Sequence, residues 1–313
     1  MVYLAESKRG AKIYFYLVQD VRFSKNNRKQ FRKYIGTQKP SKTKLEILVS
    51  GFKKEIEAEK QRLFGFHYLL PDEIAKIDKI SSKFKARFEK LNPTEKEQFE
   101  QNFVNVFVYN SNSIEGSTLT PKEVQLLLEE NISPNKPLED VLEAKSAQKA
   151  LQYIKKTKEM LTEDFLKKLH EIYFKDTKPF IAGRFKTKDN IVQGAGFKTT
   201  PARFVFTDMK LYFKDFEKLS KNFHALELAA WAHWKIEKIH PFQDGNGRIG
   251  RLIMNYVLWG NGYQMIDIKT KEKQKYFNVL EKCDKENSAE PLARILFKRF
   301  EKQYKNSLKH ARN

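Results

Sequence analysis

The sequence has one cysteine and no long apolar stretch. Cys283 cannot form a disulfide within the chain, and the first ten residues, MVYLAESKRG, lack the apolar core of a secretory signal. Charged residues interrupt every candidate for the roughly 20 apolar residues that cross a bilayer, including residues 226–239. We therefore expect a cytoplasmic protein that does not enter a membrane.

Acidic residues are scarce relative to basic ones. The chain has 60 Lys and Arg against 39 Asp and Glu, a formal net charge of +21, and residues 1–45 hold 12 of the basic residues but only Glu6 and Asp20 as carboxylates. Such a field favours nucleotides, nucleic acids, acidic proteins and anionic lipids alike. Residues 1–45 are a candidate nucleic-acid-binding segment, although a small β-module with charged edge strands has a similar composition.

The order of sequence patterns predicts a mainly α protein with a small β-module at its N-terminus. Residues 12–35 alternate aromatic and β-branched residues around an Asn-Asn turn, which is typical of a β-hairpin. Helical spacing then dominates, with capping boxes at Thr94 and Thr120 and a loop expected at 110–118. Glycine and β-branched residues predict a second hairpin at 183–206. We expect two domains, residues 1–60 and 61–313, with further helices at 43–63, 138–157, 163–174 and 226–239.

Residues 240–251, HPFQDGNGRIGR, form a glycine-rich loop that leads into a helical segment. Free backbone N–H groups at the start of a helix bind anions, and Gly245 and Gly247 allow the close approach of a phosphate. Arg248 and Arg251 lie three residues apart on one helix face, where their guanidinium groups can hold terminal phosphates. The pattern predicts a polyphosphate site.

Two further side chains of this loop indicate chemistry rather than anion binding alone. Asp244 is a carboxylate in a cationic loop, which indicates that Mg²⁺ bridges it to a phosphate. His240 titrates near neutrality and can take a proton from an attacking hydroxyl, while Asn246 can donate to an α-phosphate oxygen.

Two other interpretations of the same residues are weaker. Residues 245–250 also match GxGxxG, but the preceding segment has helical periodicity, whereas a dinucleotide-binding fold requires a strand there. His224, His233 and His240 lack the spacing and the cysteine partners of a zinc site, so His233 is better explained as a packed helix residue.

The string HPFQDGNGRIGR resembles the HPFxDGNGRxxR signature of the Fic (filamentation induced by cAMP) family, and residues 182–185, 229–233 and 262–263 follow the same family pattern. The resemblance covers about residues 90–300. It implies a Fic fold, a nucleotidyltransferase that moves AMP from ATP to a protein hydroxyl, His240 as the base and Asp244 as the Mg²⁺ ligand. By the same resemblance Gly245, Asn246, Gly247, Arg248 and Arg251 bind ATP, and the hairpin at 183–206 is a flap that docks the target.

Residues 111–116, SNSIEG, resemble the inhibitory motif of one Fic class, on a helix near 95–116. The resemblance implies that Ser111, Glu115 and Gly116 form a brake, in which Glu115 pairs with Arg251 and prevents productive binding of the γ-phosphate. The brake would make the protein an auto-inhibited protein adenylyltransferase.

Several alternatives stay open at this point. Some Fic proteins remove AMP instead of adding it, and others transfer a different phosphate-containing group. In another class of function, the protein is a nucleic-acid-binding regulator that acts through residues 1–45. The expected partners are ATP, Mg²⁺ and a protein with a Ser, Thr or Tyr hydroxyl, with the chain itself as one candidate target and a homo-oligomer as a candidate assembly.

Overall fold

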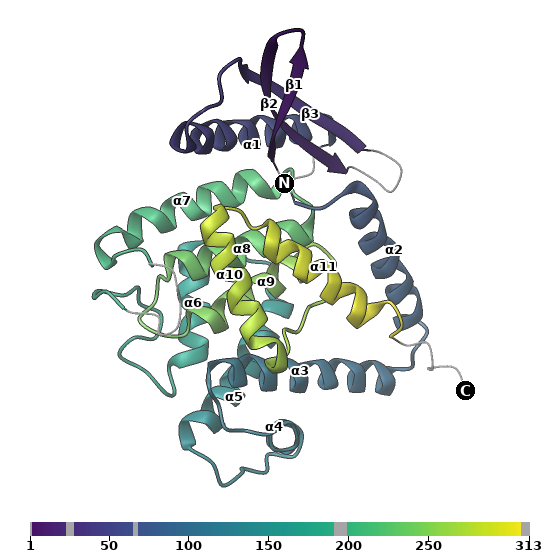
Figure 1. Cartoon of the computed structure of the whole chain (residues 1–313). Coiled ribbons are helices and arrows are strands. Elements are labelled where there is room, and N and C mark those ends of the chain that lie inside the picture. The colour runs from purple at the N-terminus through teal and green to yellow at the C-terminus, as the bar shows by residue number, and fades with distance from the viewer. Residues whose placement is uncertain (1, 23–27, 65–67, 191–198, 308–313) are drawn as a thin grey trace. The chain divides into compact units, whose positions relative to one another are not determined.

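The computed structural model describes residues 2–22, 28–64, 68–190 and 199–307. The chain divides into two compact units, Met1–Lys76 and Ile77–Asn313 (Figure 1). Helix α2 (Pro71–Phe88) runs across this division. The expected domains, residues 1–60 and 61–313, stay a prediction.

The first unit is a three-stranded antiparallel sheet with one helix. Strands β1 (Tyr3–Arg9), β2 (Lys12–Arg22) and β3 (Arg28–Gly36) lie in the order β1-β2-β3. Leu17 and Val21 of the sheet pack against Phe52 and Ile56 of α1 (Lys42–Phe64). The hairpin predicted at 12–35 is confirmed as β2 and β3, but β1 was not predicted, because Glu6, Ser7 and the basic residues of YLAESKR weaken its strand signal.

The second unit is helical, so the prediction of a mainly α protein is confirmed. The helices that follow α2 are α3 (Pro93–Glu115), α4 (Pro121–Glu129), α5 (Leu138–Lys156), α6 (Glu163–Phe174), α7 (Ala202–Ser220), α8 (Ala225–Ile239), α9 (Asn246–Gly260), the short η1 (Thr270–Glu272), α10 (Lys273–Glu286) and α11 (Glu290–Tyr304).

Helices α8 and α9 form the centre of this unit (Figure 1). Most side chains of α8 are buried, among them Leu226, Ala230 and Ile236, because other helices surround it and leave it no solvated face. The turn between α8 and α9 is therefore fixed at both ends by buried helices. This turn holds the residues of the predicted phosphate loop.

Helix α3 differs at both ends from the helix that local patterns predict, although its bounds lie close to the range 95–116 that the family resemblance implies. Its capping box is formed by Asn92 and Glu95, two residues before the predicted Thr94, while the capping box at Thr120 is confirmed. The expected loop at 110–118 is helical as far as Glu115, although Asn and Ser are weak helix formers. Asn110 is buried and hydrogen-bonds Thr270, so tertiary contacts outweigh local propensity here.

The hairpin predicted at 183–206 is wrong where the structure describes it. Phe185 pairs with Phe242 of the phosphate loop in an isolated bridge, and Ala202 already begins helix α7. Val205, Met209 and Tyr212 form the buried face of that helix. Their spacings of four and three are helical, but in a short segment rich in aromatic residues this pattern is hard to distinguish from a strand. Residues 191–198, the middle of the predicted flap, lie outside the described residues.

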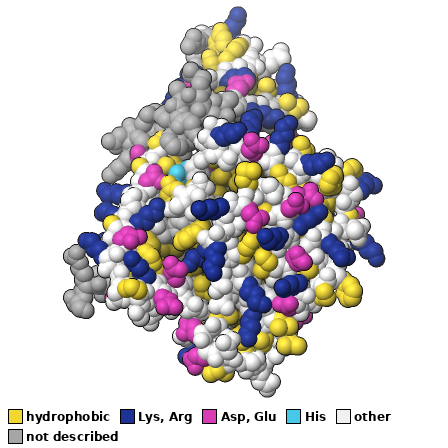
Figure 2. Space-filling view, turned by 180° about the vertical axis from the view of Figure 1, so that it is seen from behind, with side chains coloured by type: hydrophobic (Ala, Val, Ile, Leu, Met, Phe, Trp, Pro, Cys, Tyr) yellow, Lys and Arg dark blue, Asp and Glu magenta, His cyan; other side chains and the backbone are white. Residues whose placement is uncertain are grey.

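Among the described residues no helix is both long and apolar enough to cross a membrane. Figure 2 shows Lys and Arg side chains scattered among carboxylates on the face in view. Much of the positive charge on this face is therefore interspersed with acidic groups. A basic side chain without an acidic partner is thus a better candidate for binding an anionic ligand than the charge of the chain as a whole.

Candidate active site

His240 ends α8 in the left-handed conformation, with φ 54°. The turn aims the chain away from α8 and leaves the imidazole 13% exposed. Its Nδ1 lies 3.3 Å from the carbonyl oxygen of Glu237. Because a carbonyl can only accept, this contact places the proton on Nδ1 and leaves Nε2 as the free basic nitrogen.

Burial keeps His240 neutral. It lowers the pKa of the imidazole to about 4, with the positive charge of Lys186 acting in the same direction against the Glu237 carbonyl and the nearby carboxylates. A neutral imidazole at pH 7 is the form that accepts a proton. A role of His240 as the base, which the resemblance implies, requires this neutral form and stays a prediction.

The loop after His240 is held by hydrogen bonds from buried side chains. Asn246 binds the backbone of Phe242 twice, with its Oδ1 accepting from the N–H and its Nδ2 donating to the carbonyl, both at 2.9 Å. His170 Nε2 lies 3.1 Å from the Asp244 carbonyl, and its Nδ1 accepts from Gly183 N–H. The Asn246 amide is thus engaged within the loop, and its contact with an α-phosphate stays a prediction.

Two glycines of the loop lie close to other side chains. Gly245 precedes α9 with φ 82°, and a Cβ there would lie 2.3 Å from the ring of Phe174. At Gly247, a Cβ would lie 2.4 Å from Glu115 Oε1. The Glu115 carboxylate therefore lies against Gly247 in the first turn of α9, where the sequence predicts a phosphate.

We expect Gly245→Ala to lower the free energy of unfolding by more than about 2 kcal/mol, because it combines a left-handed backbone with a clash against an aromatic ring. Gly260→Ala is the matched control, since its Cβ would meet nothing within 4 Å and Ala is the better helix former. Urea unfolding followed by circular dichroism measures both. Equal stability of the two variants would contradict the packing argument.

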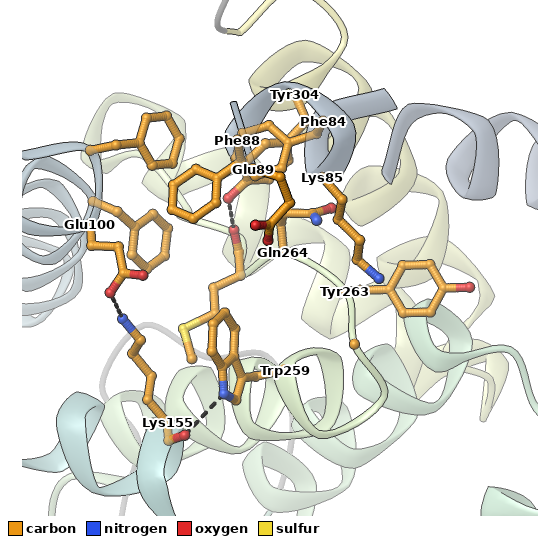
Figure 3. Close-up of a pocket in the computed structure, with 14 residues that line it drawn as sticks. Phe84, Lys85, Phe88, Glu89, Glu100, Lys155, Trp259, Tyr263, Gln264 and Tyr304 are labelled. Atoms are coloured by element: carbon orange, nitrogen blue, oxygen red, sulfur yellow. Dashed lines mark hydrogen bonds and ion pairs between the residues drawn. The ribbon is translucent and has the colours of Figure 1, made fainter. Parts of the chain in front are cut away.

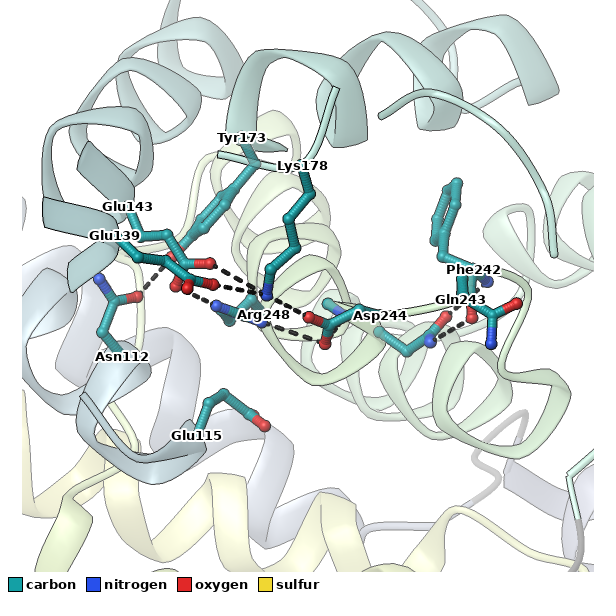
Figure 4. Close-up of polar contacts among 12 residues, drawn as sticks. Asn112, Glu115, Glu139, Glu143, Tyr173, Lys178, Phe242, Gln243, Asp244 and Arg248 are labelled. Atoms are coloured by element: carbon teal, nitrogen blue, oxygen red, sulfur yellow. Dashed lines mark hydrogen bonds and ion pairs between the residues drawn. The ribbon is translucent and has the colours of Figure 1, made fainter. Parts of the chain in front are cut away.

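Asp244 and Arg248 belong to a charge network that the motif alone does not reveal (Figure 4). Arg248 Nη2 lies 3.2 Å from Asp244, and its Nη1 pairs with the buried Glu143 of α5. Lys178 lies between these carboxylates, with Nζ 2.5 Å from Asp244 and 3.5 Å from Glu143. Glu139, one turn before Glu143, also pairs with Lys178 at 2.9 Å.

This network keeps Asp244 ionised. Burial alone would raise the pKa of its carboxyl, but Arg248 and Lys178 outweigh burial and hold the pKa below its usual value. For Glu143 burial prevails over Arg248 and raises the pKa. Asp244 is the more accessible of the two carboxylates, with a side chain 42% exposed.

The residues around Asp244 fit a Mg²⁺ ion bound together with a nucleotide. Among the described residues no group of three or more His, Cys, Asp and Glu is arranged to hold a metal. Mg²⁺ at nucleotide sites is commonly bound by one or two carboxylates plus phosphates and water. A single ionised Asp244 suits this mode, and its pairing with Lys178 shows that the carboxylate already binds a cation.

Glu115 and Arg251 form an ion pair at the start of α9. Arg251 Nη2 lies 2.7 Å from Glu115 Oε1, while its Nε and Nη2 donate to the side chain and the carbonyl of Ser111 at 3.0 and 2.9 Å. The Arg251 side chain is 1% exposed, and Nη1 is buried without a hydrogen-bond partner in the described part of the chain. The predicted pairing of Glu115 with Arg251 is present.

Because of its position at the end of α3, Glu115 depends on Arg251 to stabilise its negative charge. Gly116 ends α3 in the left-handed conformation, with φ 109°, so Glu115 is the last helical residue. A carboxylate is unfavourable at the negative end of a helix dipole. Burial also raises the pKa of Glu115, but Arg251 and Arg248 outweigh it and hold the pKa below its usual value.

Three residues that contact the phosphate loop were not predicted from the sequence. Glu143 and Lys178 pair with Arg248 and Asp244, and Asn190 donates to the carbonyls of Phe242 and Gln243 at 3.2 and 3.4 Å. The spacing of Glu139 and Glu143 by one helical turn is the only local signal. Glu143, Lys178 and Asn190 come from separate segments, so no motif of contiguous residues contains all three.

An apolar cavity lies elsewhere (Figure 3). It has a volume of about 330 Å³ and contains none of the predicted site residues. Helices α2 and α3 and the end of α9 supply its lining, which includes Phe84, Phe88, Phe99, Phe103 and Trp259. The candidate active site is therefore the polar loop, where the titratable groups converge.

Comparison with known proteins identifies the class. Residues 160–258 match the Fic/DOC family. A Fic domain containing signaling protein from Bacteroides thetaiotaomicron is 31% identical, with a TM-score of 0.67 over 74% of this chain and 95% of that one. Fic-1 from C. elegans has a TM-score of 0.69 over 87% of this chain and 80% of that one, but its 20% identity supports the fold alone. The chain belongs to the Fic family.

Curated relatives carry a more specific name. Proteins named protein adenylyltransferase Fic from Nematostella vectensis and Drosophila persimilis are each 30% identical, over 185 and 199 residues. The matches cover 56% and 60% of this chain but only 42% and 38% of those relatives. The chain thus spans about two fifths of their length.

The alternative of a dinucleotide-binding fold is excluded by the structure. Such a fold requires a strand before the glycine-rich loop, and the segment there is the helix α8.

Proposed function

We propose that this protein transfers AMP from Mg²⁺-bound ATP to a Ser, Thr or Tyr hydroxyl of a protein, as an adenylyltransferase. The observation that carries the proposal is the convergence of a neutral His240, an ionised Asp244 and two buried arginines around the start of α9. This arrangement supplies a base, a metal ligand and cations for phosphates within one loop.

The mechanism follows from the positions of these groups. The Nε2 of His240 takes the proton of the target hydroxyl as its oxygen bonds to the α-phosphorus and pyrophosphate leaves. The first N–H groups of α9 and the guanidinium groups of Arg248 and Arg251 bind the phosphates and stabilise their charge. When bound, Mg²⁺ neutralises phosphate charge, and Asp244 is the carboxylate that would hold it.

Glu115 is the inhibitory residue in this proposal. Its carboxylate lies against Gly247 and occupies Arg251 Nη2, so it competes with an outer phosphate for the same guanidinium. Two anions in this space repel each other, and the nucleotide is held away from the productive orientation. Ser111 and Gly116 act with it, one by fixing Arg251 and the other by ending α3 at Glu115.

Intact-mass spectrometry tests the reaction class. Wild-type protein and Glu115→Gly are incubated separately with Mg²⁺ and ATP or UTP, and each product is digested to locate the modification. A gain of one AMP on a hydroxyl residue with ATP supports the proposal. A gain of UMP without any gain of AMP would assign a different transferase. Removal of AMP from a modified target, with no addition by either protein, would assign the reverse reaction.

We expect transfer to depend little on pH between about pH 6 and 7.5. A histidine with an ordinary pKa of about 6.5 would be only about a quarter neutral at pH 6. Because burial lowers the pKa of His240 to about 4, its base form persists well below pH 6. The rate constant kcat/KM of Glu115→Gly at pH 6 should stay within about twofold of that at pH 7.5. A fall of about fourfold that follows a single proton would show that His240 titrates with an ordinary pKa.

A further inference from the structure

The first unit presents a sheet face covered with tyrosines. In the strand register Ala5 lies opposite Tyr16, which lies opposite Tyr34, and Ser7 lies opposite Tyr14. Opposed residues of antiparallel strands share a face. The three rings cluster, with Tyr34 centred 6.1 Å from Tyr14 and 5.5 Å from Tyr16.

The same register places an aromatic and two cations beside this cluster. Tyr3 lies opposite Val18, which is buried and lies opposite Arg32. The guanidinium of Arg32 stacks 3.8 Å from the ring centre of Tyr16. Tyr3 and Tyr34 are 48% and 52% exposed, so their ring surfaces are available for contact. Lys12, two residues before Tyr14, is exposed on the same face.

The two faces of the sheet differ in charge compensation. On the face that packs on α1, Lys29 pairs with Glu59 at 3.4 Å, and Lys33 pairs with Glu55. On the tyrosine face Lys12 and Arg32 have no acidic partner among the described residues. Asp20, a described carboxylate on this face, accepts a hydrogen bond from Gln30 at 3.0 Å. Lys29 and Lys33 are therefore paired on the α1 side of the sheet, whereas Lys12 and Arg32 on the tyrosine face form no ion pair with a described residue.

We propose that the tyrosine face of the β1-β2-β3 sheet binds single-stranded nucleic acid. Flat aromatic rings provide stacking surfaces for unpaired bases, and neighbouring cations contact the phosphates. A duplex keeps its bases stacked inside and offers only phosphates and groove edges, so it would leave the tyrosine rings unused. An anionic lipid surface or an acidic peptide would match the charge but has no planar bases for exposed Tyr3 and Tyr34. This function is independent of adenylyl transfer.

Fluorescence anisotropy of the full chain tests the proposal. The probes are labelled oligothymidylate and oligouridylate of about 20 nucleotides, which exceeds the roughly 4 to 16 nucleotides that one such surface covers. Tyr34→Ser should raise the Kd about tenfold through the loss of stacking, whereas Tyr34→Phe keeps the ring and should bind as wild type. Arg32→Gln should weaken binding and reduce the slope of log K against log salt by about 0.7.

Lys29→Gln is the matched control, because it removes the same charge from the same strand on the opposite face. It should bind the oligonucleotides within about twofold of wild type. Equal weakening by Lys29→Gln and Arg32→Gln would overturn the proposal, as would wild-type affinity in Tyr34→Ser. Tighter binding to a duplex of equal length, or binding to phosphatidylserine vesicles without binding to either oligonucleotide, would also overturn it. Circular dichroism of each variant verifies that the sheet is retained.

Discussion

Glu115→Gly should raise the rate of self-modification with Mg²⁺ and ATP by at least about tenfold. The substitution removes the carboxylate that lies 2.7 Å from Arg251 Nη2 and frees the guanidinium for an outer phosphate. It also removes the anion that lies against Gly247, at the start of α9, where the proposed mechanism places the phosphates. The measurement is the initial rate of AMP incorporation over a range of ATP concentrations, since a freed arginine should lower KM or raise kcat.

The double variant Glu115→Gly with Arg251→Ala should lose this gain. If Glu115 acts through Arg251, the two substitutions are coupled and their effects do not add. Glu130→Gly is the control, because it removes an exposed carboxylate at the end of the neighbouring helix α4. An unchanged rate in Glu115→Gly at every ATP concentration would rule out the inhibitory role, and a gain that survives in the double variant would assign it to another contact.

The parts of the structure that sequence predicted best are those with local causes. The Thr120 capping box and the helix at 163–174 depend on residues within a few positions of each other, and both are confirmed. The loop at 240–251 lies between two helices, as its glycines and the following apolar run indicate. The resemblance then supplied roles for its side chains, and the structure brings those side chains together.

The parts that failed depend on contacts between distant segments. Residues 110–115 are polar and looked like a loop, but Ser111 and Asn112 are buried against Arg251 and Tyr173, which keeps the helix intact to Glu115. Residues 202–206 looked like a strand because of their aromatic residues, yet they bury one face as part of α7. The network of Glu143 and Lys178 matches no motif of contiguous residues, since its residues meet only in the folded chain.

Substitution of His240 should abolish transfer while leaving nucleotide binding intact. In the proposed mechanism the imidazole moves a proton and holds no phosphate, so its loss should reduce kcat by roughly 10²- to 10⁴-fold in the Glu115→Gly background. His240→Asn is preferable to His240→Ala, because His240 has φ 54° and Asn tolerates this conformation better than Ala.

Two measurements on His240→Asn with Glu115→Gly separate catalysis from binding. The first is AMP incorporation by intact mass. The second is the increase in Tm caused by Mg²⁺ and ATP. The proposed mechanism assigns nucleotide binding to Arg248, Arg251 and the start of α9, so this increase should match that of Glu115→Gly. If incorporation continued at the rate of Glu115→Gly, His240 would not be the base. If the ATP-dependent shift in Tm disappeared together with activity, the imidazole would be a nucleotide-binding group. Its Nε2, left free because Nδ1 contacts the Glu237 carbonyl, would then contact the nucleotide instead of transferring a proton.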